Sequence, residues 1–409
     1  MIESDDWGLC GWSPDEPAWR ALAELPAFRS PPGRRYGGST LERAEDVREL
    51  ARLLAELRGG DGFAPVLQAN TVMAGPAFER LTPPAFDVAE LPVTESYAAS
   101  ARWRRDGLAA AVDTAIEAGV WWPELHGLHH VPEHAWLTAL RRGVDDARRA
   151  LEHHSTICTA VEASGEYDPS EPRELRRRHI GRAVERFARR FGRPPGSLCP
   201  PDYRWDDALE ADAEALGLTT LQGLAEQSGH PLARLRRLAL RHRWPNRRGG
   251  RFYLPPRIAF EPGAWEPDAR GSLVESTRRR VRAAWDRGQP AILSTHRVNY
   301  VHLDPERARR GRDTLRDLLS RLVEDGAAFL TDAEVRQLEE RSWSARAIGS
   351  AAVIIRSYGV GGEPIRVRAP AGAAGASIRE GRGMVEPLRL EDCTLVARLE
   401  PGEYRVQWD

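Results

Sequence analysis

Lysine is absent from this chain of 409 residues, so all 59 basic residues are arginine. The absence excludes Schiff-base chemistry, lysine anchoring of pyridoxal phosphate and the lysine of a phosphate-binding loop. Four cysteines lie far apart and form no Cys-x-x-Cys pair, which argues against a disulfide scaffold or a zinc ribbon. No apolar run approaches about 18 residues, so no membrane span is expected. The 60 acidic residues leave a net charge of −1, so no bulk charge favours a nucleic-acid partner.

The N-terminus has no basic stretch followed by an apolar run, and we expect a cytoplasmic protein. Two adjacent acids, Asp5 and Asp6, stand near the tip of the chain after a short apolar stub. Termini usually fray, so a functional acid pair here would need a longer first strand. We therefore expect the natural start to lie upstream, which leaves a signal peptide open.

Short apolar runs alternate with long amphipathic patterns, which is typical of a parallel α/β fold. The predicted strands are Ile2–Ser4, Ala64–Ala69, Val120–Pro123, Ser197–Pro200, Thr219–Gln222, Tyr253–Ala259, Ala291–Thr295 and Ala327–Leu330. The predicted helices are Leu41–Leu57, His134–Glu152, Glu171–Phe191, Asp206–Leu216, Ser272–Arg287, Glu306–Glu324 and Asp332–Arg341. About seven or eight strand–helix units predict a (β/α) barrel, complete or one unit short.

The sequence changes character after Arg341. Residues 343–409 lose the helical period and form short alternating runs between Gly/Pro turns. This pattern predicts two domains, a barrel over residues 1–342 and a small antiparallel β-sandwich over residues 343–409. Two long, weakly periodic stretches, 74–107 and 223–252, are expected to build the rim of the barrel.

The strongest chemical motif is the run from Trp121 to His130, directly after a predicted strand. On one helical turn, the spacing of His126 and His130 would place both imidazoles on the same face, able to share a divalent metal. His129 is expected to point away. In Asp5-Asp6, one carboxylate could bind the metal while the other takes a proton from water. A chance His pair and an exposed acidic start are the alternatives.

Three further motifs follow predicted strands. His296 comes after an apolar run and could act as a general acid, or could be a satisfied core histidine. Two prolines precede Tyr203 and would fix its position. Arg257 and Glu261 flank another strand, and we expect Arg257 to be the functional one, holding the base carboxylate in place. Turn chemistry is the alternative for these last two motifs.

The order of these motifs resembles the polysaccharide deacetylase superfamily (the NodB-homology domain, or carbohydrate esterase family 4, and its relatives). Ser4-Asp5-Asp6-Trp7-Gly8 is similar to that family's T-F-D-D-G. His126-Gly127-Leu128-His129-His130 resembles H-[ST]-x-x-H, with Gly127 in place of the hydroxyl residue. Leu293-Ser294-Thr295-His296 is one residue wider than L-x-H, and Pro200-Pro201-Asp202-Tyr203 meets R-x-P-Y without the Arg. The chain resembles a divergent branch of deacetylase-like proteins associated with surface polysaccharides.

The resemblance implies a fold, an activity and a set of residues. The fold is a distorted (β/α)7 barrel of the glycoside hydrolase/deacetylase type with a small C-terminal all-β domain. The activity is metal-dependent hydrolysis of the acetyl group from an N-acetylated sugar of a poly- or oligosaccharide. Asp5 would be the general base and His296 the general acid. The implied metal ligands are Asp6, His126 and His130. Zinc is the default for such a site, and cobalt, nickel, manganese or iron are also acceptable.

A carbohydrate is the expected partner, because aromatic faces stack on sugar rings. We expect Trp7, Trp122, Tyr203 and Arg257 to contact the substrate, whereas the oligomeric state stays open. Four alternatives remain at this point: another carbon–nitrogen amide hydrolase, a glycoside hydrolase, a catalytically dead glycan-binding barrel and a mononuclear iron oxygenase.

Overall fold

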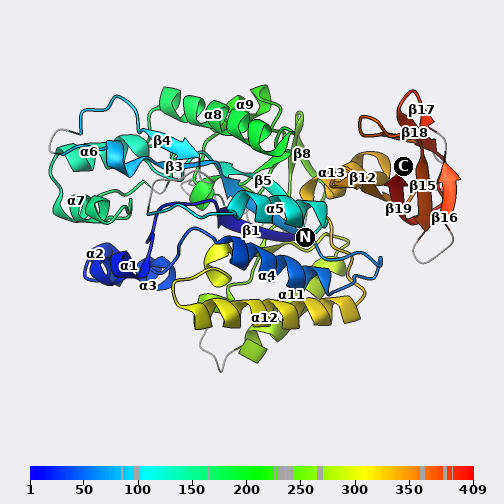
Figure 1. Ribbon diagram of the computed structural model, residues 1–409, viewed down its shortest axis with the longest axis horizontal. Helices are drawn as coiled ribbons and strands as arrows, with labels where there is room; N and C mark the ends of the chain where they lie inside the picture. The colour runs from blue at the N-terminus through cyan, green and yellow to red at the C-terminus, as the bar shows by residue number, and fades with distance from the viewer. Residues whose placement is uncertain are drawn as a thin grey trace.

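The structure is a computed structural model of the whole chain (Figure 1). It describes all residues except 84–85, 96–101, 164, 225–226, 228–234, 236–238, 240–242, 265–269, 360–363, 381–384 and 389. Half of the predicted rim stretch 223–252 therefore lies outside the described residues. In the other stretch, the described part of 74–107 contains a small hairpin of β3 (Ala74–Pro76) and β4 (Val93–Glu95).

A nine-stranded, mostly parallel sheet forms the centre of the molecule, in the order β10-β11-β1-β2-β5-β6-β7-β9-β8. Its parallel strands are β1 (Ile2–Trp7), β2 (Leu67–Val72), β5 (Trp121–Gly127), β6 (Ser197–Leu198), β7 (Thr220–Leu221), β9 (Arg251–Tyr253), β10 (Ile258–Ala259) and β11 (Leu293–His296). The edge strand β8 (Asn246–Arg248) is antiparallel to β9. Within the described residues β10 and β8 do not pair, so the seven-unit barrel is not confirmed.

In the view of Figure 1, α8 and α9 lie above this sheet and α4, α11 and α12 lie below it. Ala69, which clusters with α4, and Leu125, which clusters with α8, lie on the same face of their strands, so both groups of helices cover one face of the sheet. Among the described residues, the α-helices outside the N-terminal segment are α4 (Ala44–Ala55), α5 (Leu108–Glu117), α6 (Glu133–Arg141), α7 (Asp145–Glu152), α8 (Arg173–Phe191), α9 (Asp207–Ala215), α11 (Arg270–Trp285), α12 (Pro305–Glu324) and α13 (Asp332–Arg341). In α12, Ala308, Gly311, Leu315 and Leu322 are buried at intervals of three to seven residues. This stripe faces the core while arginines occupy the outer face. The predicted mixed α/β architecture is confirmed.

Three predicted elements differ in the structure. Ala327–Leu330 is not a strand, although its first carbonyl accepts a hydrogen bond from Gly60 N (2.9 Å). The predicted helix His134–Glu152 is two helices, because Gly143 between them adopts a left-handed φ of 74°. The predicted strand Tyr253–Ala259 is split between β9 and β10, because two intervening prolines cannot donate to a ladder.

An N-terminal segment between β1 and β2 adds three short helices that periodicity did not predict. They are α1 (Glu16–Leu22), α2 (Pro26–Arg29) and α3 (Pro31–Tyr36). Their apolar residues pack with Ala150 of α7 into a small separate cluster, against which Trp12 and Ile157 also lie. The segment therefore has its own local core beside the main sheet.

Two small antiparallel sheets follow α13 in the chain. One contains β12 (Trp343–Ile348), β13 (Ala352–Ser357), β15 (Ala376–Glu380), β16 (Val385–Leu388) and β19 (Gly402–Trp408), and the other contains β14 (Ile365–Arg368), β17 (Leu390–Glu391) and β18 (Thr394–Ala397). Ile355 and Val406 from the first sheet and Leu395 from the second are buried in one shared cluster. A small all-β part is thus present as predicted, whereas the domain boundary at residue 342 stays a prediction.

A buried ion network joins these sheets to the rest of the chain. Arg356 of β13 donates from Nε (3.1 Å) and Nη2 (2.5 Å) to Asp61 Oδ2, and also pairs with Glu334 of α13. Arg346 of β12 pairs with Glu334 (3.0 Å) and donates to Gly119 O (2.8 Å). Neither guanidinium reaches solvent, since both residues are at most 2% exposed.

Across the part of the chain that the structure describes, no helix has both the length and the apolar character needed to cross a bilayer.

Candidate metal centre and active site

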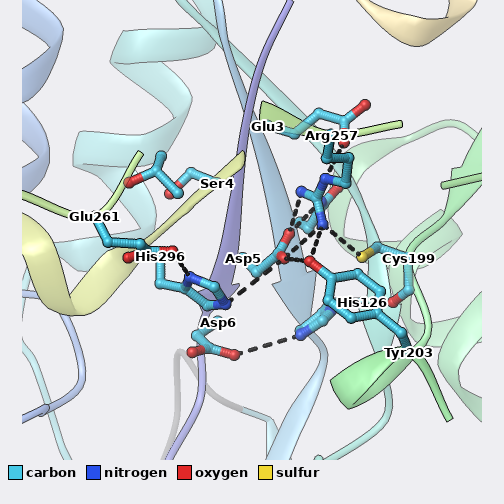
Figure 2. Close-up of polar contacts among 12 residues, drawn as sticks. Glu3, Ser4, Asp5, Asp6, His126, Cys199, Tyr203, Arg257, Glu261 and His296 are labelled. Atoms are coloured by element: carbon cyan, nitrogen blue, oxygen red, sulfur yellow. Dashed lines mark hydrogen bonds and ion pairs between the residues drawn. The ribbon is translucent and has the colours of Figure 1, made fainter. Parts of the chain in front are cut away.

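The candidate site lies where strands of the parallel sheet end. Asp5, near the end of β1, is paired in register with His296, the last residue of β11. His126 lies near the end of β5, two strands from β1 in the sheet order. Because the carboxyl ends of parallel strands meet at one edge, these side chains converge there (Figure 2). Together with Asp6 and His130 they line a cavity of about 610 Å³.

Asp6, His126 and His130 form a group that fits a divalent metal. The Oδ1 atom of Asp6 lies 3.3 Å from His126 Nε2 and 3.8 Å from His130 Nε2. His126 donates its Nδ1 hydrogen to the carbonyl of Cys199 (2.8 Å), which leaves the Nε2 lone pair directed at Asp6. Such a hydrogen bond on the far nitrogen is the usual support of a metal-ligating histidine. Two imidazoles and one carboxylate are also the donors that Zn²⁺ and its neighbours prefer.

The backbone that carries these donors is not the predicted helical turn. His126 belongs to a strand, and His130 follows in a turn with φ 59°. Asp6 likewise has φ 74°. The left-handed conformation of a non-glycine residue costs roughly 1–2 kcal/mol, and such residues cluster at functional sites. The two histidines therefore approach each other through a strained turn and not through helical spacing.

Gly127 stands where the similar deacetylase motif has a serine or threonine. The structure explains why a glycine is needed at this position. Its φ is 144°, and a Cβ added there would lie 2.2 Å from Glu166 Oε1. The same oxygen accepts hydrogen bonds from the backbone N–H groups of Leu128 (2.6 Å) and His129 (3.4 Å). A carboxylate from another loop thus binds the turn and leaves no room for a side chain at position 127.

A second group of possible ligands, His129, Glu133 and His179, is better explained as a hydrogen-bond network. Val131 N donates to His129 Nδ1 (3.1 Å), so this nitrogen is an acceptor and the proton of a neutral ring sits on Nε2. A protonated Nε2 cannot ligate a metal, but it points at Glu133 Oε2, 3.5 Å away. His179 Nε2 lies 3.0 Å from the same oxygen. His129 therefore points away from the site, as expected.

Asp5 is held as a carboxylate by a buried arginine. Arg257 Nη1 and Nη2 donate to Asp5 Oδ2 (2.9 Å) and Oδ1 (3.0 Å), and Asn70 donates to Oδ1 (2.6 Å). Burial raises the pKa of Asp5, but the charge of Arg257 outweighs it and brings the pKa well below the usual range. Arg257 also pairs with Glu3 (2.7 Å) on the far side of its guanidinium. Asp5 therefore stays ionised at any working pH.

His296 is paired with a second carboxylate. Its Nδ1 lies 2.5 Å from Glu261 Oε1, while its Nε2 lies 3.9 Å from Asp5 Oδ2. Glu261 also pairs with Arg35 (2.6 Å) and accepts from Asn299 Nδ2 (2.6 Å). Burial lowers the pKa of His296, but the charge and hydrogen bond of Glu261 raise it to about 9 overall. His296 is consequently a proton donor at neutral pH.

The residues predicted to contact substrate fall in different places. Trp7 is 1% exposed, donates to Ser4 Oγ (2.9 Å) and packs edge-on against Trp121. Trp122 donates to a carboxylate of its own strand, Glu124 (2.8 Å). Neither tryptophan lines the cavity, so the structure does not support substrate contact by them.

Arg257 does not line the cavity either, because its guanidinium is committed to Asp5 and Glu3. Tyr203 does line it, with its hydroxyl 3.4 Å from Asp5 Oδ2. Of the four predicted contact residues, Tyr203 is therefore the one that remains placed for that role.

Several residues of the site were not found from the sequence. The sequence favours Arg257 over Glu261, although an acid directly after a strand is a usable signal. Asn70, Glu166 and Tyr36 carried no signal, because no motif contains them and each reaches the site through tertiary structure. Much of the apolar part of the cavity wall comes from Leu9, Trp12, Ala27, Pro32, Pro132, Ile157 and Val161.

No family model matches the chain, and no curated protein matches it. Among solved structures, it is similar to a protein from Mycobacterium smegmatis described as a polysaccharide deacetylase, with 14% identity and a TM-score of 0.40 over 83% of this chain and 89% of that one. A 4-alpha-glucanotransferase from Thermococcus litoralis has 12% identity and a TM-score of 0.39, over 82% of this chain and 39% of that one. A de-N-acetylase from Aggregatibacter actinomycetemcomitans has 12% identity and a TM-score of 0.21, over 54% of this chain and 86% of that one. Values this low establish neither a family nor a function for the chain.

Proposed function

We propose that this protein is a metal-dependent hydrolase that removes the acetyl group from an N-acetylated sugar of a poly- or oligosaccharide. The observation that carries the proposal is one cavity that holds a set of metal donors, a separate ionised acid and a protonated histidine. Asp6, His126 and His130 are the donors, Asp5 is the acid and His296 is the histidine. The resemblance of the motif order to polysaccharide deacetylases suggests the same reaction.

Asp6, His126 and His130 would hold the metal, with zinc as the default and cobalt, nickel, manganese or iron as alternatives. When bound, such an ion supplies Lewis acidity, which makes a coordinated water easier to deprotonate and polarises a carbonyl oxygen. Three protein donors leave coordination positions open, which distinguishes a catalytic site from a closed structural one.

Asp5 and His296 divide the proton transfers. Asp5 takes a proton from the attacking water, and its ion pair with Arg257 keeps it ionised and correctly oriented. The water oxygen bonds to the acetyl carbon and the carbon–nitrogen bond breaks. His296 gives its Nε2 proton to the departing nitrogen, and Glu261 at Nδ1 keeps the ring protonated until then. The acid product passes the remaining proton of the water to the released amine, so the products are acetate and an amino sugar in its ammonium form. The proton on Asp5 then returns to His296, which restores both groups, so atoms and charge balance.

Metal analysis and acetate release test the proposal together. The purified protein should contain close to one equivalent of a divalent metal and release acetate from N-acetylglucosamine oligosaccharides. Asp6→Ala and His126→Ala should lose the metal, whereas Asp5→Asn should keep it and lose turnover. His179→Gln is the matched control, since this buried histidine of the rejected cluster should leave metal content unchanged.

Four results would contradict the proposal. Undiminished metal in Asp6→Ala and His126→Ala would remove these residues as ligands. Full turnover in Asp5→Asn would remove Asp5 as the base. Release of sugar instead of acetate by the wild-type protein would identify a glycoside hydrolase, and metal-free protein without turnover would identify a glycan-binding barrel.

A further inference from the structure

Hydrolysis of an amide builds negative charge on the carbonyl oxygen, and enzymes place a hydrogen-bond donor where that charge appears. Backbone N–H groups beside the two prolines, next to Tyr203 on the cavity wall, are one possible source of such a donor. In the structure Tyr203 N donates to Pro200 O (3.1 Å) and Arg204 N donates to Pro201 O (3.2 Å). These two N–H groups are used within their own turn and are not free to bind a substrate oxygen.

Tyr36, the last residue of α3, lines the same cavity and belongs to the N-terminal helical segment. Its ring meets the ring of His296 edge-on, with the centroids 5.8 Å apart and the planes at 77°. Its own faces are occupied, because Trp12 stacks on it at 5.7 Å and the Arg35 guanidinium lies 4.9 Å from its centroid. The ring is therefore fixed in place beside the proposed general acid.

The backbone holds Tyr36 equally firmly. A Cβ at Gly33 would lie 2.2 Å from Ala27 O, so α3 packs against α2 more closely than any other residue at that position would allow. Ser30 Oγ caps the helix through Gly33 N (3.1 Å), and Tyr36 O accepts from Ser39 N (2.7 Å). A donor that is already ordered costs no reorganisation when the reaction takes place.

The Tyr36 hydroxyl is available as a donor. Among the described residues, none makes a hydrogen bond to it. Burial raises its pKa far above the usual value, and the negative charge of Glu261 raises it further, so the group stays protonated. Arg35 opposes this rise only in part. A neutral phenol facing acidic neighbours gives a hydrogen bond to a substrate oxygen and has no tendency to ionise.

We propose that the Tyr36 hydroxyl donates a hydrogen bond to the acyl oxygen of the substrate as negative charge develops on it. This role rests on the proposed function of the same cavity. It assigns a catalytic contact to the N-terminal helical segment, which contains none of the motifs shared with deacetylases. The interaction is stronger in the transition state than in the bound substrate, so its loss should appear in kcat and not in KM.

Tyr36→Phe removes the hydroxyl and keeps the ring between Trp12 and Arg35. We expect kcat for acetate release to fall about 100-fold, the lower end for one lost oxyanion donor, with KM within about twofold and metal content unchanged. Tyr358→Phe is the matched control. Tyr358 lies directly after β13 and is 48% exposed, so its substitution should leave kcat, KM and metal content unchanged. A thioacetyl substrate gives a further readout, since sulfur accepts hydrogen bonds weakly and the loss should shrink.

Three outcomes overturn the inference. An unchanged kcat in Tyr36→Phe removes the hydroxyl from the reaction. A raised KM with unchanged kcat makes Tyr36 a ground-state contact, and a loss of metal makes it a structural residue. If the wild-type protein carries metal and releases acetate, these outcomes count against Tyr36 alone. A wild-type protein that releases no acetate refutes the proposed function and this inference with it.

Discussion

Replacing Glu261 with Gln should move the alkaline limit of activity. Glu261 Oε1 lies 2.5 Å from His296 Nδ1 and is the strongest influence that keeps His296 protonated. The amide of Glu261→Gln retains an oxygen that can accept from Nδ1, while its NH2 group replaces Oε2 and loses the contacts with Arg35 and Asn299. At His296 the variant therefore keeps the acceptor and removes the charge.

The size of the effect follows from the pKa values. The pKa of His296 rises from 6.5 to about 9, and a rise of about 2.5 corresponds to about 3 kcal/mol. At pH 8 a group of pKa about 9 is about nine-tenths protonated, whereas a group of pKa about 6.5 is only about 3% protonated. If the variant returns to the ordinary value, kcat at pH 8 should fall about 30-fold with little change at pH 6.

The same pair stabilises the fold in a defined pH range. Because the folded-state pKa of His296 is raised, its contribution is complete below pH 6.5 and disappears as the pH rises through about 9. In Glu261→Gln the free energy of unfolding should drop at pH 6 and approach that of the wild type near pH 10. Urea unfolding at the two pH values measures this directly.

The decisive assay is the pH profile of kcat for acetate release, from pH 5.5 to 10. Glu162→Gln serves as control, because Glu162 is an exposed carboxylate on the wall of the same cavity and should leave the profile unchanged. If the alkaline limb of the profile stays near pH 9 in Glu261→Gln, this ion pair does not set the pKa of the proton donor His296. An equal loss of kcat at pH 6 and pH 8 would show that Glu261 acts through geometry and not through charge.

Two further substitutions test the support of the fold and of the metal turn. Arg356→Met should lower the free energy of unfolding by about 3–5 kcal/mol, because it leaves the buried Asp61 without its arginine and leaves Glu334 with Arg346 alone. Urea unfolding should show a far smaller change for the exposed Arg405→Met, and equal stability of both variants would contradict the reasoning. Gly127→Ala should destabilise by more than about 1 kcal/mol and reduce metal content, because the new methyl group would collide with Glu166 at a positive φ. Wild-type stability and metal content in this variant would show that the turn is looser than its geometry implies.

The general architecture followed from the sequence because hydrophobic periodicity reports which face of an element is buried. Long helices such as α8 and α12 were predicted nearly to their ends. The short helices α1 to α3 were not, because each is too short to show a period and depends on the small cluster around Phe28. The run Ala327–Leu330 has the composition of a strand but no ladder, and a partner strand cannot be read from local sequence.

For the site, the sequence indicated residues that stand at strand ends, because an acid or a histidine after an apolar run is conspicuous. It gave the wrong backbone for His126 and His130, since four-residue spacing was interpreted as helical. The sequence alone could not show which residues from distant segments contact the site. Arg257 meets Asp5 across 252 residues of sequence, and Tyr36 reaches the cavity only because α3 packs tightly on α2. Such contacts depend on tertiary packing and leave no local pattern.

The exchange at Gly127 also affects how this protein can be recognised. The turn that positions the histidines is bound by Glu166, a carboxylate that comes from a different loop and takes the space of a side chain within the motif. A sequence pattern that requires a hydroxyl residue between the two histidines would miss this chain, although Asp6, His126 and His130 are all present. Detecting it calls for a description of which atoms surround the turn, in whichever loop they originate.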